Sequence, residues 1–456
     1  MRQILTLFLV PVALGASAQI NYLTFDDALS LALERNPAVV ASEYAELAAH
    51  RERQAAIGLF MPKVSVKGAY AHLDKDVKID FNPMLSSLSP IIGDGLSALG
   101  LDLSYTLQHR NTAFLGGDVV LPIFTGGRIL TANKAAKINE ERVQEQGRGV
   151  RGRLVVEVVE RYFGVELARR AVAIRKEAVG VVKQHLHDVE ILAEEGMAVE
   201  SERLYAEFRL AEAERDLRRA QLQFSTAQEA LLTSLGMSKV PLPTTPMFLL
   251  RKLEPLEFFV CTAELRNPQL GEVAKMRELA RMNLRLHRAE FFPEIAAMGG
   301  MVFCNHQLSP LVPRMAVGVG INFKIFDGLN RESRYSAARL QLRQVEALET
   351  KAERDIVLLI KDLYNDVEAV MSTVEAVERS ERFAEEFLRT QRLAFREGAA
   401  TSTDVVDAVL SLSRAKLEKV QTAYEFDLAL ARLLEASGMG EEFVRYLHSK
   451  GAHSIF

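Results

Sequence analysis

Two aspartates, Asp404 and Asp407, lie three residues apart in the segment "TSTDVVDAV", shortly after a glycine at 398. On a helix this spacing places both carboxylates on one face, where together they attract cations. The alternative is that they only favour the first turn of a helix, where negative charge opposes the positive end of the helix dipole. In a chain with 60 acidic residues, such a pair is weak evidence for acid/base catalysis.

The nine histidines are scattered along the sequence. His185 and His187 are two residues apart on an expected helix, so they point in different directions and we expect surface histidines rather than joint metal ligands. The sequence contains no Gly-x-Ser-x-Gly or His-Glu-x-x-His motif and no cysteine pair with zinc spacing. We therefore expect no enzyme, no cofactor and no metal site.

Composition bounds the remaining possibilities. The chain has 456 residues, which is more than a single core usually organises, and its formal net charge of −4 gives no indication of nucleic-acid binding. Residues 1–18 are typical of a secretory signal peptide, with Ala16 and Ala18 before the expected cleavage site. Beyond residue 19 no apolar run is long enough for a transmembrane helix, so a mature chain that crossed a membrane would need strands closed into a β-barrel.

The sequence is duplicated. "ERNPAV" at Glu34 resembles "LRNPQL" at Leu265, and Pro62 and Pro293 share the same offset of 231 residues. Later anchors share an offset of 202 residues, so the first copy carries about 30 extra residues, which we place in a long loop at 72–113. The resulting divisions are a signal peptide (1–18), a first repeat (19–238), a Pro-rich linker (239–260), a second repeat (261–439) and a C-terminal tail (440–456).

Each repeat contains residues that alternate as in a β-strand. From Met315 to Ile325 every second residue is apolar and the intervening residues are small or polar, which fits the length of a tilted membrane strand. The first copy alternates similarly at 64–70 and 115–123, and we expect two strands per repeat. "LPIFTGGR" at Leu121 and "FKIFDGLNR" at Phe323 each lead from a strand through a glycine turn into a helix.

Long paired helices follow each strand pair. We expect helices at about 131–194 and 332–397, a turn at Gly196 and at Gly398, and a return helix after each turn. Both return helices carry a seam with steps of four and three residues, which is typical of antiparallel coiled-coil packing. The seam residues are Ala206, Leu210, Ala213, Leu217, Ala220, Phe224, Ala227 and Leu231 in the first copy, and Ala408, Leu412, Ala415, Lys419, Thr422, Phe426, Ala429 and Leu433 in the second.

This order of elements resembles the outer-membrane efflux protein family, the TolC-like channels. The resemblance extends from about Leu23 to Gly438 and is carried by the Asn-Pro helix starts, the two strand ends, the glycine turns and the segment "TDVVDAVLSLSRAKLE". It implies a mainly α fold with β: a homotrimer in which each chain gives four strands to one twelve-stranded outer-membrane barrel and long helices form a periplasmic tunnel. It also implies a periplasmic adaptor (membrane fusion protein) and an inner-membrane pump as partners.

The resemblance also implies roles for individual residues. Asp404 and Asp407 match the family positions whose aspartates ring the closed tunnel entrance, whereas the first copy has Glu202 and Tyr205 at the equivalent places. Repulsion within such a ring would raise the pKa of these carboxyls. Gly196 and Gly398 match the hairpin tips that contact the adaptor.

The expected function is a passive exit duct for efflux or type I secretion, and the sequence does not separate drugs, metals or proteins as the exported substrate. The alternative is a periplasmic coiled-coil scaffold or adaptor whose strands form a soluble domain. Four strands cannot close a barrel alone, and open strand edges in lipid are costly, so membrane strands would require oligomerisation. A scaffold would leave the membrane with salt or carbonate, whereas a barrel requires detergent.

Overall fold

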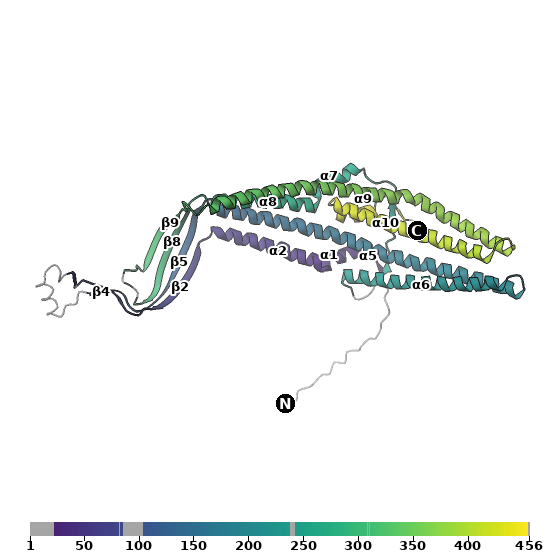
Figure 1. Cartoon of the computed structure of the whole chain (residues 1–456), viewed down its shortest axis with the longest axis horizontal. Coiled ribbons are helices and arrows are strands. Elements are labelled where there is room, and N and C mark those ends of the chain that lie inside the picture. The colour runs from purple at the N-terminus through teal and green to yellow at the C-terminus, as the bar shows by residue number, and fades with distance from the viewer. Residues whose placement is uncertain are drawn as a thin grey trace, which may run out of the picture. The chain divides into compact units, whose positions relative to one another are not determined.

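The computed structural model describes residues 22–81, 83–84, 104–237, 242–307, 309 and 311–454. The fold is mainly helical, with long helices and short strands (Figure 1). The first part of the chain forms β1 (Tyr22–Leu23), α1 (Phe25–Arg35), α2 (Pro37–Ile57), β2 (Lys63–His72), β3 (Val77–Asp80), β4 (Ser104–Gln108), β5 (Asn111–Thr125), α5 (Arg128–Glu194) and α6 (Glu200–Leu235). The second part forms β6 (Leu242–Pro243), β7 (Phe248–Leu250), α7 (Leu256–Arg266), α8 (Pro268–Ala289), β8 (Glu294–His306), β9 (Met315–Asn322), α9 (Asn330–Arg396), α10 (Ser402–Ala436), α11 (Phe443–Leu447) and β10 (Ala452–Ser454).

These elements belong to two compact units. The first unit contains residues 1–44, 145–271 and 351–456, and the second contains residues 45–144 and 272–350. Four helices, α2, α5, α8 and α9, begin in one unit and end in the other. The expected signal peptide lies outside the described residues.

The Asn-Pro pairs begin helices, as the sequence predicted. α2 starts at Pro37 and α8 at Pro268, where the missing proline N–H would have had no helical partner. The side chain of Asn36 accepts a hydrogen bond from the amide of Ala38 at 2.8 Å, and Asn267 accepts bonds from two amides of the first turn of α8 at 2.8 and 3.0 Å. In each copy the asparagine therefore caps the helix that the proline opens.

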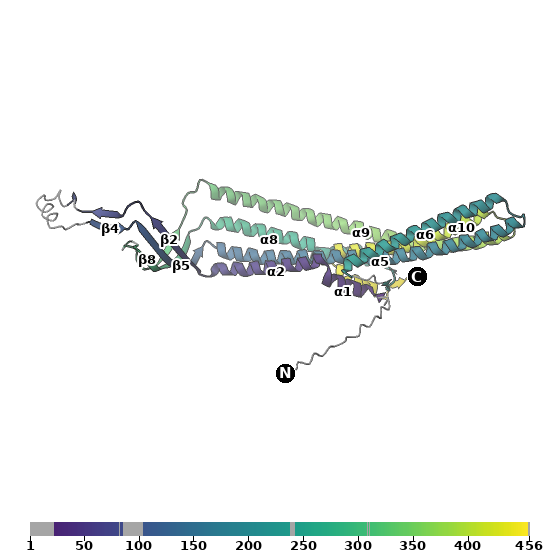
Figure 2. The same cartoon turned by 90° about the horizontal axis from the view of Figure 1, so that it is seen from below.

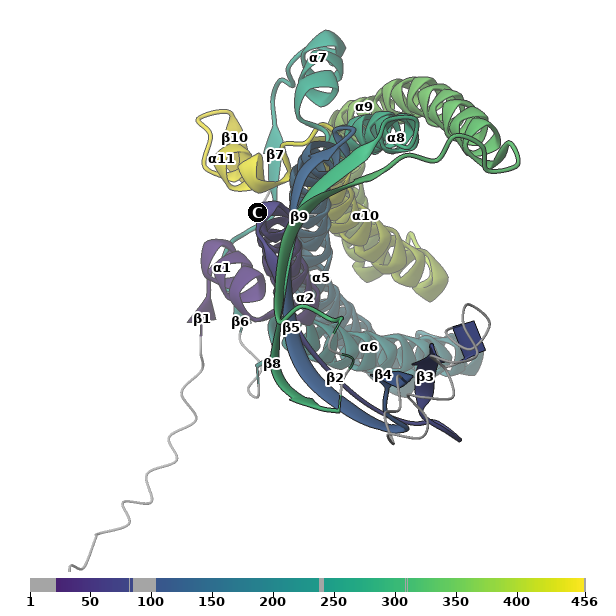
Figure 3. The same cartoon turned by 90° about the vertical axis from the view of Figure 1, so that its left-hand side faces the viewer.

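The second unit contains a four-stranded sheet in the order β2-β5-β8-β9, with every neighbouring pair antiparallel (Figure 1). Seen end-on, the sheet is a curved layer (Figure 3). The expected alternation is present: Val317, Val319 and Ile321 on β9 are all exposed apolar residues, at 80%, 65% and 71%. β9 ends at Asn322, three residues earlier than the alternation predicted.

β9 ends where its partner strand begins, because Asn322 pairs with Glu294, the first residue of β8, and the segment that follows is held by Arg331 in the first turn of α9. Its guanidinium donates to the carbonyls of Lys324 and Ile325 at 2.8 and 3.1 Å, so these groups are not available to a neighbouring strand. The side chain also lies over the ring of Phe291, with 5.2 Å from Cζ to the ring centroid. In the first copy the arginine after the glycine turn is Arg128, one residue earlier in the repeat, and it forms an ion pair with Glu294 at 2.5 Å. The arginine of each strand end therefore fixes the transition from strand to helix.

The first unit is organised around two helical hairpins, in which α6 lies along α5 and α10 lies along α9 (Figure 1, and turned by 90° in Figure 2). The predicted seam residues are partly buried between helices: on α6 these are Ala206, Ala213 and Ala220. On α10 the buried seam residues are Ala408, Ala415, Thr422, Phe426 and Leu433. A larger hydrophobic core lies along these helices, away from the hairpin tips. In it, Phe25 of α1 packs against the rings of Tyr162, Phe163 and Phe443.

Two predictions for irregular segments were incomplete. The Pro-rich segment at 239–260 contains β6, the fully buried β7 and the start of α7, and the C-terminal tail contains α11 and β10. β10 pairs with β7 antiparallel, with His453 opposite Leu249. The loop of the first repeat also contains the antiparallel pair β3-β4. None of the helices in the described part of the chain combines the length and the apolar character that crossing a bilayer requires.

Candidate functional site

Asp404 closes a capping box at the start of α10. Its carboxylate accepts hydrogen bonds from the backbone amide of Thr401 at 2.8 Å and from the Thr401 hydroxyl at 2.7 Å, while its own amide is directed to that hydroxyl. These bonds, led by the one from the hydroxyl, hold the pKa of the Asp404 carboxyl below its ordinary value. Within one chain this carboxylate therefore has a helix-start role, and its pKa is shifted opposite to the rise expected for a ring of aspartates.

Asp407, one turn later, connects the two hairpins. Its Oδ1 atom accepts from Nη2 of Arg209, on α6, at 3.1 Å, and the Arg209 Nη1 atom donates to Glu212 at 2.8 Å. The guanidinium lies 5.5 Å from the ring centroid of Tyr205, the first-copy counterpart of Asp407. The two aspartates thus have different partners, Asp404 on its own helix and Asp407 on the other hairpin.

Sequence analysis overlooked Arg209. It lies four residues after Tyr205, so the two side chains share a helix face, and it lies next to the seam residue Leu210. The clue was a difference between the copies: Asp407 in the second copy corresponds to Tyr205 in the first, which carries no charge. A partner for Asp407 was therefore to be sought on the first return helix.

The glycines at 196 and 398 form the two hairpin tips, as predicted. Both have left-handed backbone, with φ of 74° and 72°, and each is followed by an amide that bonds back to the helix end: Met197 to Leu192 at 2.7 Å and Ala399 to Ala394 at 2.8 Å. A side chain at either position would meet open space, so only the backbone conformation requires glycine. Contact of these tips with an adaptor stays a prediction.

The expectation of a surface position is wrong for His185. Its side chain is buried, its Nε2 atom lies 2.8 Å from the hydroxyl of Ser402 in the first turn of α10, and its ring packs edge-on against Phe395. Burial lowers the pKa of this imidazole, and nearby Asp188 opposes the effect. His187 is exposed, as expected. The periodicity argument separated the two rings correctly but did not identify the one that faces the neighbouring hairpin.

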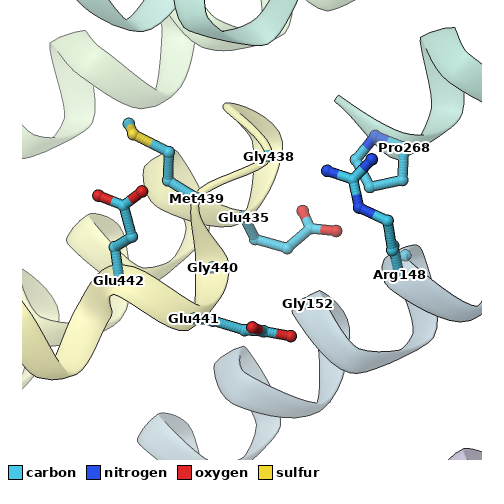
Figure 4. Close-up of a pocket in the computed structure, with 10 residues that line it drawn as sticks. Arg148, Gly152, Pro268, Glu435, Gly438, Met439, Gly440, Glu441 and Glu442 are labelled. Atoms are coloured by element: carbon cyan, nitrogen blue, oxygen red, sulfur yellow. The ribbon is translucent and has the colours of Figure 1, made fainter. Parts of the chain in front are cut away.

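A separate acidic pocket lies where α10 ends in the first unit (Figure 4). Its volume is about 160 Å³, and it is lined by Glu435, Glu441 and Glu442, by Arg148 and by glycines of the turn after α10. Burial raises the pKa of Glu435, and Arg153 partly offsets this. Glu442 is paired with Arg266 at 3.0 Å. Among the described residues no group of histidine, cysteine and acidic side chains has the arrangement of a metal site.

Comparison with known proteins identifies the architecture. Residues 28–237 and 260–439 match the family model described as "Outer membrane efflux protein". The curated protein "Outer membrane protein TolC" of Escherichia coli (strain K12) is 22% identical over 201 residues, which are 41% of this chain and 41% of that protein. The aligned region therefore spans less than half of either protein.

Solved structures match over far more of the chain. VceC from Vibrio cholerae aligns with a TM-score of 0.72 at 15% identity, covering 91% of this chain and 96% of that one. The CmeC channel of Campylobacter jejuni aligns with a TM-score of 0.74 at 14% identity, covering 93% and 89%. These likenesses show the fold, which is TolC-like, and the family match covers both repeats. The chain belongs to the outer membrane efflux protein family, whose members are non-enzymatic transport proteins of the outer membrane.

Proposed function

We propose that this protein is the passive outer-membrane exit duct of a tripartite efflux or type I secretion system. The observation that carries the proposal is the sheet β2-β5-β8-β9, whose two outer strands have free edges in the described structure and many of whose large apolar residues are exposed. In water such a surface favours aggregation, and in lipid the free edges would leave backbone groups without partners. Both problems disappear if the sheets of several copies join into one closed barrel.

Three copies give the twelve-stranded barrel of the TolC-like family. In this arrangement the chain is a homotrimer, the helices extend into the periplasm, and the hairpin tips at Gly196 and Gly398 meet a periplasmic adaptor that connects to an inner-membrane pump. The pump, rather than this chain, supplies the energy. Repeats at 19–238 and 261–439, joined by a Pro-rich segment, are the units of this assembly, and cleavage after Ala18 gives the mature chain.

The experiment is extraction followed by conductance. The expected result is that carbonate leaves the protein in the membrane, that detergent releases a particle with the mass of three chains, and that this particle conducts ions in planar bilayers. Release by carbonate, with a stable monomer that never conducts, would instead identify a periplasmic scaffold or adaptor and would reject the duct.

We further propose that Asp404 and Asp407 form the gate. Around a threefold axis they would gather six carboxylates, which attract cations because like charges concentrate the negative potential. The ion pair between Asp407 and Arg209 supports a closed conformation, because it holds the gate helix against the first hairpin. Asp404 supports it by fixing the beginning of the same helix.

The gate is tested with the double substitution Asp404→Asn and Asp407→Asn. It should reduce cation selectivity and block by multivalent cations added from the periplasmic side, without loss of trimer. Thr401→Ala is the matched control, because it disrupts the capping box and leaves both carboxylates in place. If Thr401→Ala reproduces the effect of the double substitution, the aspartates act only at the helix start and the gate lies elsewhere.

A further inference from the structure

A second cavity in the first unit lies among α5, α6 and α10 and has a volume of about 280 Å³. Four arginines line it: Arg175 of α5, Arg209 and Arg215 of α6, and Arg414 of α10. Only two lining residues are acidic, Glu212 and Asp216. The lining therefore has an excess of positive charge, in a chain whose formal net charge is −4.

The available carboxylates do not satisfy these arginines. Arg175 reaches Asp216 only at 3.6 Å, and Arg215 reaches Asp216 at 3.5 Å and Glu212 at 3.8 Å. Arg414 is exposed and forms no ion pair among the residues that the structure describes. Arg209 binds Glu212 and Asp407 through its terminal nitrogens, but its Nε–H is buried and has no acceptor in the described structure. A buried donor without an acceptor is costly, so this geometry favours an additional anion.

We propose that this cavity binds a small soluble polyanion, such as a diphosphate or a polycarboxylate. Guanidinium groups recognise phosphate and carboxylate oxygens through paired, charge-assisted hydrogen bonds, and several arginines around one cavity suit a ligand with adjacent negative charges. The volume is just below the usual range for drug-sized ligands, which favours a compact anion over a large substrate. The site binds its ligand by charge and hydrogen bonding, without covalent chemistry.

The cavity shares Arg209 with Asp407. Each terminal nitrogen of Arg209 already donates to one carboxylate, so a ligand that binds this guanidinium competes with Glu212 and Asp407 for its positive charge. Glu212 lies three residues from Arg209 on the same helix and stays beside it. Asp407 lies on the other hairpin, so it is the carboxylate that a ligand would displace from Arg209. The ligand and Asp407 thus compete for one side chain, which gives the proposal a signature of its own.

The test is calorimetric titration of the full-length mature protein in detergent with inorganic pyrophosphate, at low ionic strength. We expect one site per chain, with affinity weakened about tenfold by Arg414→Gln, equivalent to about 1.4 kcal/mol. Asp407→Asn should strengthen binding, because it releases Arg209 from its competitor. These two changes act in opposite directions and neither residue belongs to the core of the fold.

Matched controls remove the same charges outside the cavity. Arg219→Gln and Glu214→Gln change exposed residues on α6 that do not line it, so they report only the general electrostatic effect. If Arg414→Gln and Asp407→Asn behave like these controls, or if pyrophosphate does not bind, the proposal is wrong. Displacement of pyrophosphate by citrate supports a soluble ligand. Displacement by anionic phospholipid in the micelle, or binding of an acidic peptide in place of pyrophosphate, overturns it in favour of a lipid or a protein partner.

Discussion

Replacing Asp427 by asparagine should make the protein more stable, and increasingly so as the pH rises. Asp427 lies on α10 within the core of the first unit, is fully buried, and neither of its carboxyl oxygens has a hydrogen-bond partner in the described structure. Burial raises the pKa of this carboxyl well above its ordinary value. The backbone amide of Phe248, which does not reach hydrogen-bonding geometry, offsets only a small part of the shift.

The sign follows from where the proton is held. Above about pH 4 the unfolded chain releases this proton, whereas the folded chain keeps it until the pH reaches the raised pKa. Between these two values folding takes up one proton, so the free energy of unfolding falls by about 1.4 kcal/mol for each pH unit. The contribution of Asp427 to stability is therefore complete below the ordinary pKa and is lost as the pH rises. Asparagine has no proton to release and removes this dependence.

The measurement is thermal unfolding of the detergent-solubilised protein, followed by far-ultraviolet circular dichroism at a series of pH values. The Tm of Asp427→Asn should be close to that of the wild type near pH 4 and should exceed it by a growing margin toward neutral pH. Asp366→Asn, an exposed residue on α9, is the control and should leave the pH profile unchanged. A margin that is constant with pH would mean that the folded protein holds Asp427 ionised, and the reasoning from burial would be refuted.

Two further predictions concern single residues of the first unit. Gly438→Ala should abolish folding or lower the Tm by far more than Gly196→Ala, as parallel melting curves would show. Both glycines have positive φ, but a Cβ atom at 438 would overlap the carbonyl oxygen of Arg266, whereas at 196 it meets open space and only the backbone cost of about 1 kcal/mol remains. Because burial lowers the pKa of His185, its imidazole stays neutral in the folded chain while the unfolded chain takes up a proton near pH 6.5, so the wild type should lose Tm as the pH falls through this value. His185→Gln should lose less, and equal losses in both proteins would contradict the assignment.

Much of the fold can be predicted from the sequence because each turn and each helical seam occurs in both copies of the repeat. A single glycine between two charged helices is ambiguous, but Gly196 and Gly398 at a constant offset identify two equivalent turns, and the structure gives both the same left-handed conformation. The seam residues were similarly identifiable, because a repeat of four and three residues that persists over three heptads specifies one packed face. Local periodicity and repetition were sufficient for these elements.

The strands that sequence analysis did not predict, β7 and β10, are too short to show a periodic pattern of apolar residues. β7 and β10 are three residues each and lie about two hundred residues apart in the chain, so only tertiary pairing makes them strands. The burial of His185 likewise depends on Ser402 and Phe395, which belong to the other hairpin. In both cases the structure depends on a contact between residues far apart in the chain, which cannot be predicted from the propensity or spacing of residues within one segment.

The two copies differ at the beginning of their return helices, around Asp404 and Asp407. The first return helix begins after Val199, which makes no side-chain capping bond, whereas the second begins with the Thr401–Asp404 capping box. One turn later the first copy has Tyr205 and the second has Asp407. The first copy then contributes Arg209, which binds Asp407 and lies over Tyr205. A negative residue in the second copy is thus matched by a positive residue in the first, and their attraction joins the two hairpins. The difference between the copies therefore has a structural consequence: it gives the two hairpins an electrostatic contact near the beginning of their return helices.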